Sequence, residues 1–148
     1  MTAEHTERRT LTEIVIYPEH ADRHASREFL HNVQRLKDDG HYRCWVRGVT
    51  KDLNVHHLGC EWSLANDCDF ARLKQFCETF DPYGYGRLLR NVPMTSVDDI
   101  RNMLVLSRKV HIERGTGIHE ISFPIWISQF TCKVDAIPEE QLQKGAVL

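Results

Sequence analysis

No stretch of this sequence is apolar for long enough to cross a membrane, and the opening residues MTAEHTERRTLTE lack the apolar centre of a secretory signal. The chain also lacks a disulfide framework, because its five cysteines are odd in number and scattered. Cysteines in this arrangement are typical of a reducing compartment. We therefore expect a cytoplasmic protein with no membrane partner.

An excess of positive charge is missing too. The 19 Lys and Arg residues face 21 Asp and Glu residues, which gives a formal net charge of −2. A protein that binds nucleic acid tightly and without sequence preference is usually basic, because neutralising phosphates drives its affinity. The charge balance argues against that class, and any contact with DNA has to come from local basic residues.

What is present fits one folded domain over 1–148, ordered from about residue 10 to about residue 135. The 148 residues are 41% hydrophobic and 27% charged, which is ordinary for a globular protein. Apolar spacing, caps and turn residues favour an α+β fold. The expected elements are a strand over 11–17, a helix over 21–38, a hairpin of strands 42–46 and 53–57, a helix over 69–80, a loop over 81–94, a helix over 95–113 and a short helix over 122–130.

Two adjacent histidines, His56 and His57, end the expected strand LNVHH. Adjacent side chains on a strand point to opposite faces, so the pair can serve two different partners. Further along, Asn102 is followed by His111 with eight residues between them, and we expect both on the helix over 95–113. A strand-borne His-His, then an Asn and a later His, is the pattern on which the functional interpretation depends.

These residues resemble the motif of the HNH endonuclease family. The resemblance rests on LNVHH, on RNMLVLSRKVH and on CWVRG at 44–48. It implies a ββα-metal core, in which a two-stranded hairpin leads to a helix that completes one metal site. That core would comprise 42–60 and 98–120, with 61–97 as an insertion and with extra helices and an N-terminal strand around it.

The resemblance also implies hydrolysis of DNA phosphodiester bonds with one divalent ion: Mg²⁺, Mn²⁺, Ni²⁺ or Zn²⁺. His57 would be the general base that activates water, with Asn102 orienting it. His56 and His111 would bind the ion, and His119 could add a ligand or contact the phosphate. Basic residues around the site would contact the phosphates of DNA: Arg101, Arg108 and Lys109.

Many relatives brace the hairpin and helix with a structural zinc held by two pairs of cysteines, and this sequence departs from them. Cys44 is followed three positions later by Arg47, and the second pair would fall at Ser107 and Val110. One of the four ligands remains, whereas a structural zinc needs four. We expect no structural zinc.

Simpler interpretations stay open. The paired histidines could be polar residues at the edge of a loop, His111 a helix-surface residue and His119 the cap of a turn. Asp98 and Asp99, in TSVDD, fit the first turn of a capped helix better than a carboxylate metal site.

A second function class is open as well. The acidic balance and the missing zinc ligands also suit a catalytically inactive binding protein on the same scaffold, such as a phage-encoded inhibitor that engages a host protein. The compact domain resembles HNH proteins of phages and prophages, which would place it in the host cytoplasm. A homodimer would let one site per chain make a double-strand break, although no residue demands one.

Overall fold

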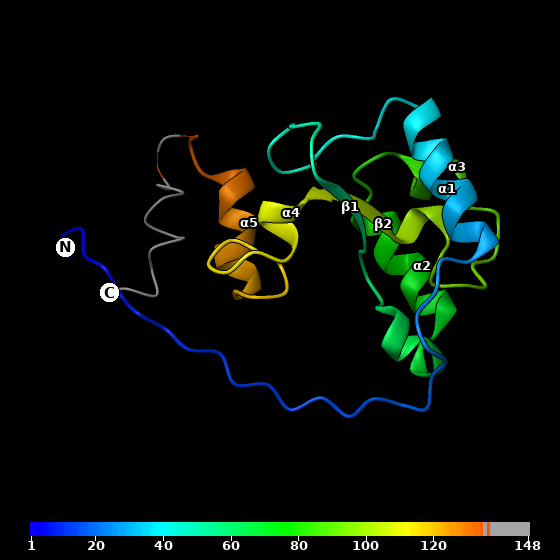
Figure 1. Ribbon diagram of the computed structural model, residues 1–148, viewed down its shortest axis with the longest axis horizontal. Helices are drawn as coiled ribbons and strands as arrows, with labels where there is room; N and C mark the ends of the chain where they lie inside the picture. The colour runs from blue at the N-terminus through cyan, green and yellow to red at the C-terminus, as the bar shows by residue number, and fades with distance from the viewer. Residues whose placement is uncertain (135, 137–148) are drawn as a thin grey trace.

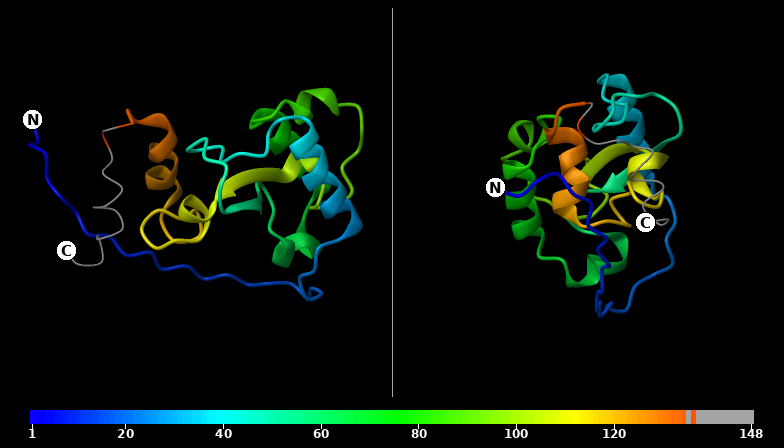
Figure 2. Two further views of the ribbon diagram at one scale, coloured as in Figure 1. Left: turned by 45° about the horizontal axis from the view of Figure 1, so that its top comes forward. Right: turned by 90° about the vertical axis from the view of Figure 1, so that its left-hand side faces the viewer.

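The computed structural model describes residues 1–134 and 136, and it combines helices with a small sheet, which confirms a mixed α and β composition. Its elements are α1 (Arg27–Asp38), β1 (Leu53–His57), η1 (Trp62–Asp67), α2 (Phe70–Thr79), α3 (Tyr85–Leu88), η2 (Ile100–Asn102), β2 (Met103–Ser107), α4 (Arg108–His111) and α5 (Phe123–Thr131), where η marks a 3₁₀ helix. Figures 1 and 2 show the sheet between α1, α2 and α3 at one end and α4 and α5 at the other. The end of the expected domain at 135 and 137–148 lies outside the described residues.

Strand β2 is the centre of the fold. All five of its residues are buried, and it pairs antiparallel with β1, with His57 opposite Met103 and His56 opposite Leu104. Alternate side chains of β2 enter two different cores. The first core contains Leu36, Tyr85, Ile100, Met103 and Val105, and the second contains Cys44, Leu104, Leu106, Val110 and Trp126. One face of the sheet therefore packs on α1 and α3, and the other on α4 and α5.

The helix expected over 95–113 is wrong. Residues 103–107, MLVLS, form β2, and helical structure is limited to the short η2 before it and α4 after it. A continuous apolar run fits a strand buried on both faces as well as a buried helix, so its periodicity does not distinguish them. Burial on both faces of the sheet favours the strand. Asn102 therefore lies directly before a strand and not at the start of a long helix.

Two expected strands are also wrong. Residues 42–46 contain a bend and the start of a turn, and the backbone N–H of Trp45 donates to the carbonyl of Val105 without extending the sheet. Residues 11–17 have no strand partner among the described residues, and Ile14 is 93% exposed. In Figure 1 this N-terminal segment runs apart from the sheet. Apolar alternation predicts a strand only where a neighbouring edge is available to pair with it.

Three expected helices are confirmed, with small shifts of their ends. Helix α1 begins later than expected, because Ser26 is its N-cap and its hydroxyl accepts from the backbone N–H of Phe29. Asp69, the first residue of the helix expected over 69–80, is the N-cap of α2, and Pro124 lies in the first turn of α5. In the part of the chain that the structure describes, no helix has the length and apolar character to cross a membrane.

Candidate metal centre and general base

His56 and His57 leave β1 on opposite faces, as neighbours on a strand must. His56 lies opposite Leu104 and therefore faces the core under α4 and α5, whereas His57 lies opposite Met103 and faces α1. Both residues are buried, with exposed fractions of 6% and 3%. The register of the sheet thus gives the two imidazoles different surroundings.

On the face of His56, three imidazoles converge to form what we call the histidine cluster: His56, His111 and His119. Ring centroids lie 5.3 Å apart for His56 and His111, and 4.9 Å apart for each pair that includes His119. One ring nitrogen from each residue lies within 4.8 Å of the other two. Over 1–134 and 136, no other three His, Cys, Asp or Glu side chains meet that condition. The cluster joins β1, the end of α4 and the loop that follows it.

The spacing of the cluster could accommodate one metal ion. Nε2 of His111 and Nε2 of His119 lie 3.2 Å apart. Two ligands of a tetrahedral ion are separated by about 3.4 Å when the metal–nitrogen bonds are about 2.0–2.1 Å long. Three protein ligands also leave a position for water or substrate, as catalytic metal sites require. The three histidines could therefore hold a metal ion.

Burial keeps two imidazoles of the cluster in the neutral form that binds cations. It lowers the pKa of His56 to about 3, and the neighbouring His119 and His111 lower it further. Burial also lowers the pKa of His111 to about 4, with His119 and then Arg23 acting in the same direction. A neutral imidazole keeps the lone pair that a metal ligand needs. At neutral pH these two side chains therefore offer lone pairs.

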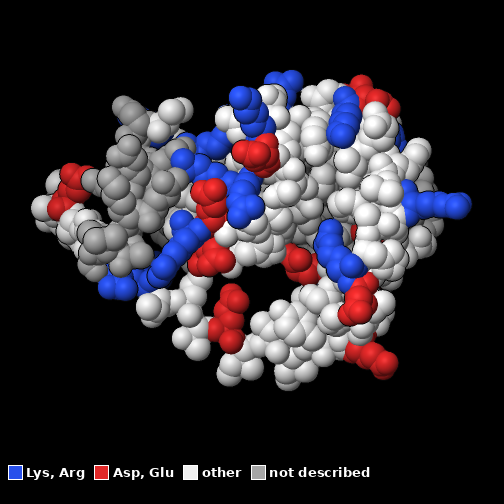
Figure 3. Space-filling view, in the orientation of Figure 1, with Lys and Arg blue, Asp and Glu red and all other residues white. Residues whose placement is uncertain are grey.

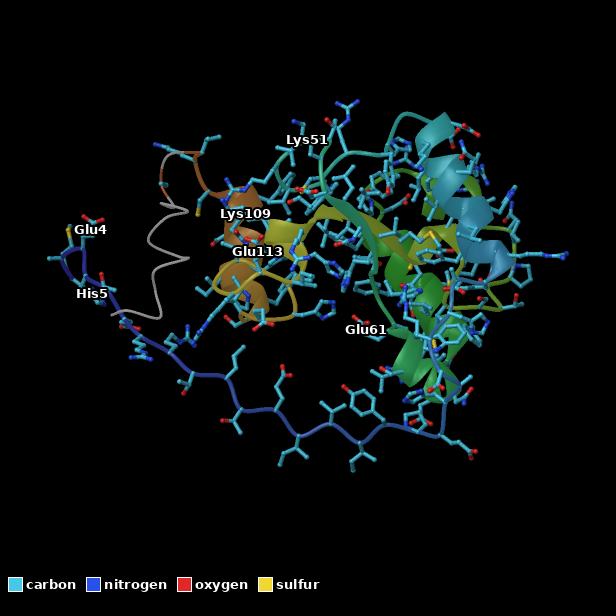
Figure 4. All side chains as sticks on the ribbon, viewed as in Figure 1. Glu4, His5, Lys51, Glu61, Lys109 and Glu113 are labelled. Atoms are coloured by element: carbon cyan, nitrogen blue, oxygen red, sulfur yellow. The ribbon has the colours of Figure 1, made fainter. Side chains whose placement is uncertain are left out.

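Polar neighbours orient the cluster. Nδ1 of His111 lies 3.2 Å from Oδ1 of Asn54, and because that oxygen can only accept, Nδ1 carries the proton. The proton on Nδ1 leaves the lone pair on Nε2, which faces His119. Oε1 of Glu61 lies 3.9 Å from Nδ1 of His56, too far for a hydrogen bond. In Figure 4, Glu61 points from the segment after β1 toward the loop after α4, so it adds negative charge beside the cluster.

On the other face of β1, His57 has a buried carboxylate as its partner. Its Nε2 lies 2.8 Å from Oδ1 of Asp98, and its Nδ1 lies 3.2 Å from Nη1 of Arg23. The ring also packs on Phe29 of α1, with centroids 6.0 Å apart. His57 is therefore held on three sides by groups far from it in the sequence.

One pocket of about 590 Å³ connects the two faces of β1. Strand β1 pairs with β2 along one edge, and its other edge has no strand partner in the described part of the chain, so side chains from both faces reach the same opening. The residues with polar groups at this opening include Arg23, His56, His57, Glu61, His111 and His119. The metal-ligand candidates and the general-base candidate thus open into one space.

The side chain of Asn102 makes its hydrogen bonds with the backbone and none with His57. Its Oδ1 accepts from the backbone N–H groups of Gly59 and Cys60, and its Nδ2 donates to the carbonyls of Cys60 and Val97. Its side chain thus makes all four hydrogen bonds that an amide can make. Asn102 fixes the chain that leaves β1, so any effect on His57 passes through the backbone.

We expect Asn102→Ala to lower the free energy of unfolding by about 2–4 kcal/mol, because it removes four hydrogen bonds of a fully buried side chain and leaves the buried carbonyl of Val97 without this partner. Urea unfolding of the two proteins measures the change. The exposed Gln75 of α2 offers a control, since Gln75→Ala should change stability by less than about 0.5 kcal/mol. A loss for Asn102→Ala as small as that of the control would contradict this role.

The predicted phosphate contacts separate into two groups. Arg101 is wrong as a phosphate contact, because its side chain is fully buried, paired with Asp99 and bonded to backbone carbonyls, including those of Leu89 and Val92. Its donors serve the fold, and none faces solvent. Arg108 is exposed on α4, and Lys109 is half-buried beside it. Figure 3 shows acidic and basic side chains interspersed on one face of the molecule, without a broad basic surface.

Two residues to which the sequence pattern gave no role at the site contact His57: Asp98 and Arg23. Asp98 fits the first turn of a helix in the sequence, yet it is buried against His57. Arg23 stands in the segment before α1, where nothing in the sequence marks it. The one available signal is that TSVDD places a carboxylate four residues before Asn102, and this does not reveal which side chain it faces.

Comparison with known proteins adds no assignment. No protein-family model, no curated protein and no solved structure matches this chain. The function is therefore inferred from the geometry of the pocket.

Proposed function

We propose that this chain is a metal-dependent HNH-type endonuclease that hydrolyses DNA phosphodiester bonds. The proposal is carried by the pocket in which the histidine cluster and His57 meet. Phosphodiester hydrolysis needs a base for the attacking water and a cation for the charge on the phosphate. The side chains of this pocket suit both roles.

The order of the elements supports a ββα-metal core with strands other than those expected. β1 carries the adjacent histidines, β2 runs antiparallel to it, and α4 follows β2 directly and ends at His111. In this arrangement the hairpin consists of Leu53–His57 and Met103–Ser107, and the expected insertion over 61–97 lies between its two strands. The core would therefore be one hairpin with a long, folded connection.

The residues of the pocket suggest a division of labour. A bound divalent ion would supply positive charge to the phosphate and the leaving oxygen. His57 holds its Nε2 against Asp98, so Nδ1 is the atom left to accept the proton of the attacking water. Arg23 donates to that same atom, at 3.2 Å. If Arg23 donates its hydrogen bond to a phosphate oxygen instead, Nδ1 of His57 becomes free to accept from water.

The ligand set favours some ions over others. Imidazole nitrogens suit Ni²⁺ and Zn²⁺, whereas Mg²⁺ prefers oxygen ligands and retains its waters. We propose that Ni²⁺ and Zn²⁺ bind more tightly than Mn²⁺ in vitro, and that Mg²⁺ binds most weakly. The ion used in a cell depends also on which metals are available there.

Nicking of supercoiled plasmid by purified, metal-free protein with each of these four ions tests the proposal. We expect metal-dependent nicking that EDTA abolishes. A His56→Ala sample purified in parallel should be inactive, which controls for contaminating nucleases. A folded wild-type protein that is inert with every ion would overturn the nuclease proposal and favour the binding-protein alternative.

We expect Arg23→Ala to weaken DNA binding about tenfold and to reduce the slope of log K against log salt by about 1, because one phosphate contact is lost. Fluorescence anisotropy with a labelled duplex, measured at several salt concentrations without a metal ion, gives both values. Arg27→Ala, which removes an exposed arginine of α1 outside the pocket, is the matched control. Equal effects of the two substitutions would show that Arg23 acts through net charge alone.

A further inference from the structure

The carboxylate of Asp98 divides its two oxygens between the general-base candidate and helix α1. Oδ1 lies 2.8 Å from Nε2 of His57, and Oδ2 accepts from the hydroxyl of Ser26 at 2.7 Å. The Asp98 and His57 side chains are 4% and 1% exposed. A buried carboxylate that faces an imidazole in this way holds the ring at a fixed angle.

The backbone of Asp98 is anchored as firmly as its side chain. Its N–H donates to the hydroxyl of Ser96 at 3.0 Å, and its carbonyl accepts from Nδ2 of Asn32 at 2.8 Å. Asn32 is itself buried on α1. Asp98 is thus bound to α1 through Ser26 and Asn32, and it cannot shift without disturbing that helix.

The two hydrogen-bond partners of His57, Asp98 and Arg23, favour the same tautomer. An ionised carboxylate only accepts, so Nε2 carries the proton; a guanidinium only donates, so Nδ1 carries the lone pair. This is the tautomer that a base needs if it takes a proton from water in the pocket. Asn102, which the motif assigns to orienting the base, has no hydrogen bond to His57, since its four bonds go to the backbone.

We propose that Asp98 is the positioning residue of His57, and that it takes the orienting role which the motif gives to Asn102. It fixes the Nε2–H tautomer and turns Nδ1 toward the pocket. The inference rests on the proposed nuclease function for its effect on turnover, but not for the tautomer itself.

Two substitutions of Asp98 and one at the cap of a different helix separate positioning from folding. Asp98→Asn and Asp98→Ala remove the charge that faces His57. Asp69→Ala removes the exposed N-cap of α2, which accepts from the backbone N–H groups of Ala71 and Arg72, and should cost about 0.5–2 kcal/mol of stability. Because Asp69 lies outside the pocket, this variant is a matched control for general destabilisation. Affinity for Ni²⁺ should stay unchanged in all three, because none of these residues belongs to the histidine cluster.

With a duplex oligonucleotide and Ni²⁺ or Mn²⁺, we expect both Asp98 variants to lower kcat about 10²-fold or more and to leave KM within about twofold, as for a carboxylate that orients a catalytic histidine. Asp69→Ala should keep kcat within about threefold of wild type. Equal losses of kcat in Asp69→Ala and Asp98→Asn would overturn the proposal, because destabilisation alone would then explain both.

Long-range ¹H–¹⁵N NMR of the metal-free, full-length protein at pH 8 tests the tautomer without any assay of cleavage. We expect Nδ1 of His57 to be unprotonated in wild type and the two tautomers to mix in Asp98→Ala. A protonated Nδ1 in wild type would overturn the inference even if DNA is cleaved. If no ion supports cleavage, the nuclease function fails, and this spectrum alone decides whether Asp98 positions the ring.

Discussion

Replacement of His57 by alanine should slow DNA cleavage by about 10²–10⁴-fold, the range that a positioned general base contributes. His57 lies outside the histidine cluster, on the opposite face of β1, so the affinity for the ion should not change. Single-turnover cleavage at saturating Ni²⁺ measures the first effect, and calorimetric titration with Ni²⁺ measures the second. The combination of lost cleavage and intact ion binding is what distinguishes a base from a ligand.

The substitution also affects folding, and a control has to separate the two effects. His57→Ala removes a buried hydrogen bond from Asp98, which should cost about 1–3 kcal/mol of stability. Urea unfolding curves show whether the variant remains folded at the assay temperature. A folded His57→Ala protein that cleaves DNA within about twofold of the wild-type rate would contradict the assignment, since a general base contributes far more.

Loss of a cluster histidine should weaken ion binding more than any other single change. We expect His111→Ala and His119→Ala each to reduce the affinity for Ni²⁺ or Zn²⁺ by more than about 100-fold, because losing a partner of a ligand already costs about 10–100-fold. Asn54→Ala, which removes such a partner from His111, should fall within that lower range. Calorimetric titration of each metal-free protein provides the affinities.

The exposed His31 of α1 supplies the matched control for these titrations. His31→Ala removes an imidazole outside the pocket, so its affinity should equal that of wild type. If His111→Ala and His119→Ala also bind the ion as tightly as wild type, the ion sits elsewhere, and the cluster is a packing feature.

The parts of the fold that follow from local sequence were predictable. Asp69 caps α2, Pro124 suits a first helical turn, and LNVHH has the alternation of a strand. Each of these signals acts within a few residues of the chain. They gave the type and approximate position of α2, α5 and β1, whereas α1 was predicted from its helical spacing alone and with too early a start.

The pairing of β1 could not be predicted in the same way. Its partner lies at 103–107, a run whose apolar residues fit a buried strand or a buried helix equally well. The nearer segment 42–46 offered a short turn and was therefore the expected partner. Selection of β2 depends on the two cores that its alternate side chains fill, and this is tertiary information that local patterns do not contain.

The residues of the candidate site likewise fall into those that the sequence predicted and those that only the fold reveals. His56, His57 and His111 were predicted from the resemblance of LNVHH and RNMLVLSRKVH to the family motif, and His119 was proposed as an additional ligand because it lies near His111 in the sequence. Asp98 and Arg23 reach His57 from 41 and 34 residues away in the sequence, so only the fold reveals them. The phosphate contact predicted for Arg101 failed for the same reason, since its burial is set by Asp99 and by the carbonyls around it.

The most direct test of a single catalytic ion in the histidine cluster couples ion binding to cleavage in one titration. Metal-free protein at a concentration well above the dissociation constant is mixed with increasing Ni²⁺, and the initial rate of plasmid nicking is recorded at each ratio. We expect a rate that rises linearly and stops rising at one ion per chain, with His119→Ala requiring a large excess. Nicking that persists without the ion in EDTA, or no nicking at any ratio, would contradict a metal-dependent nuclease built on this cluster.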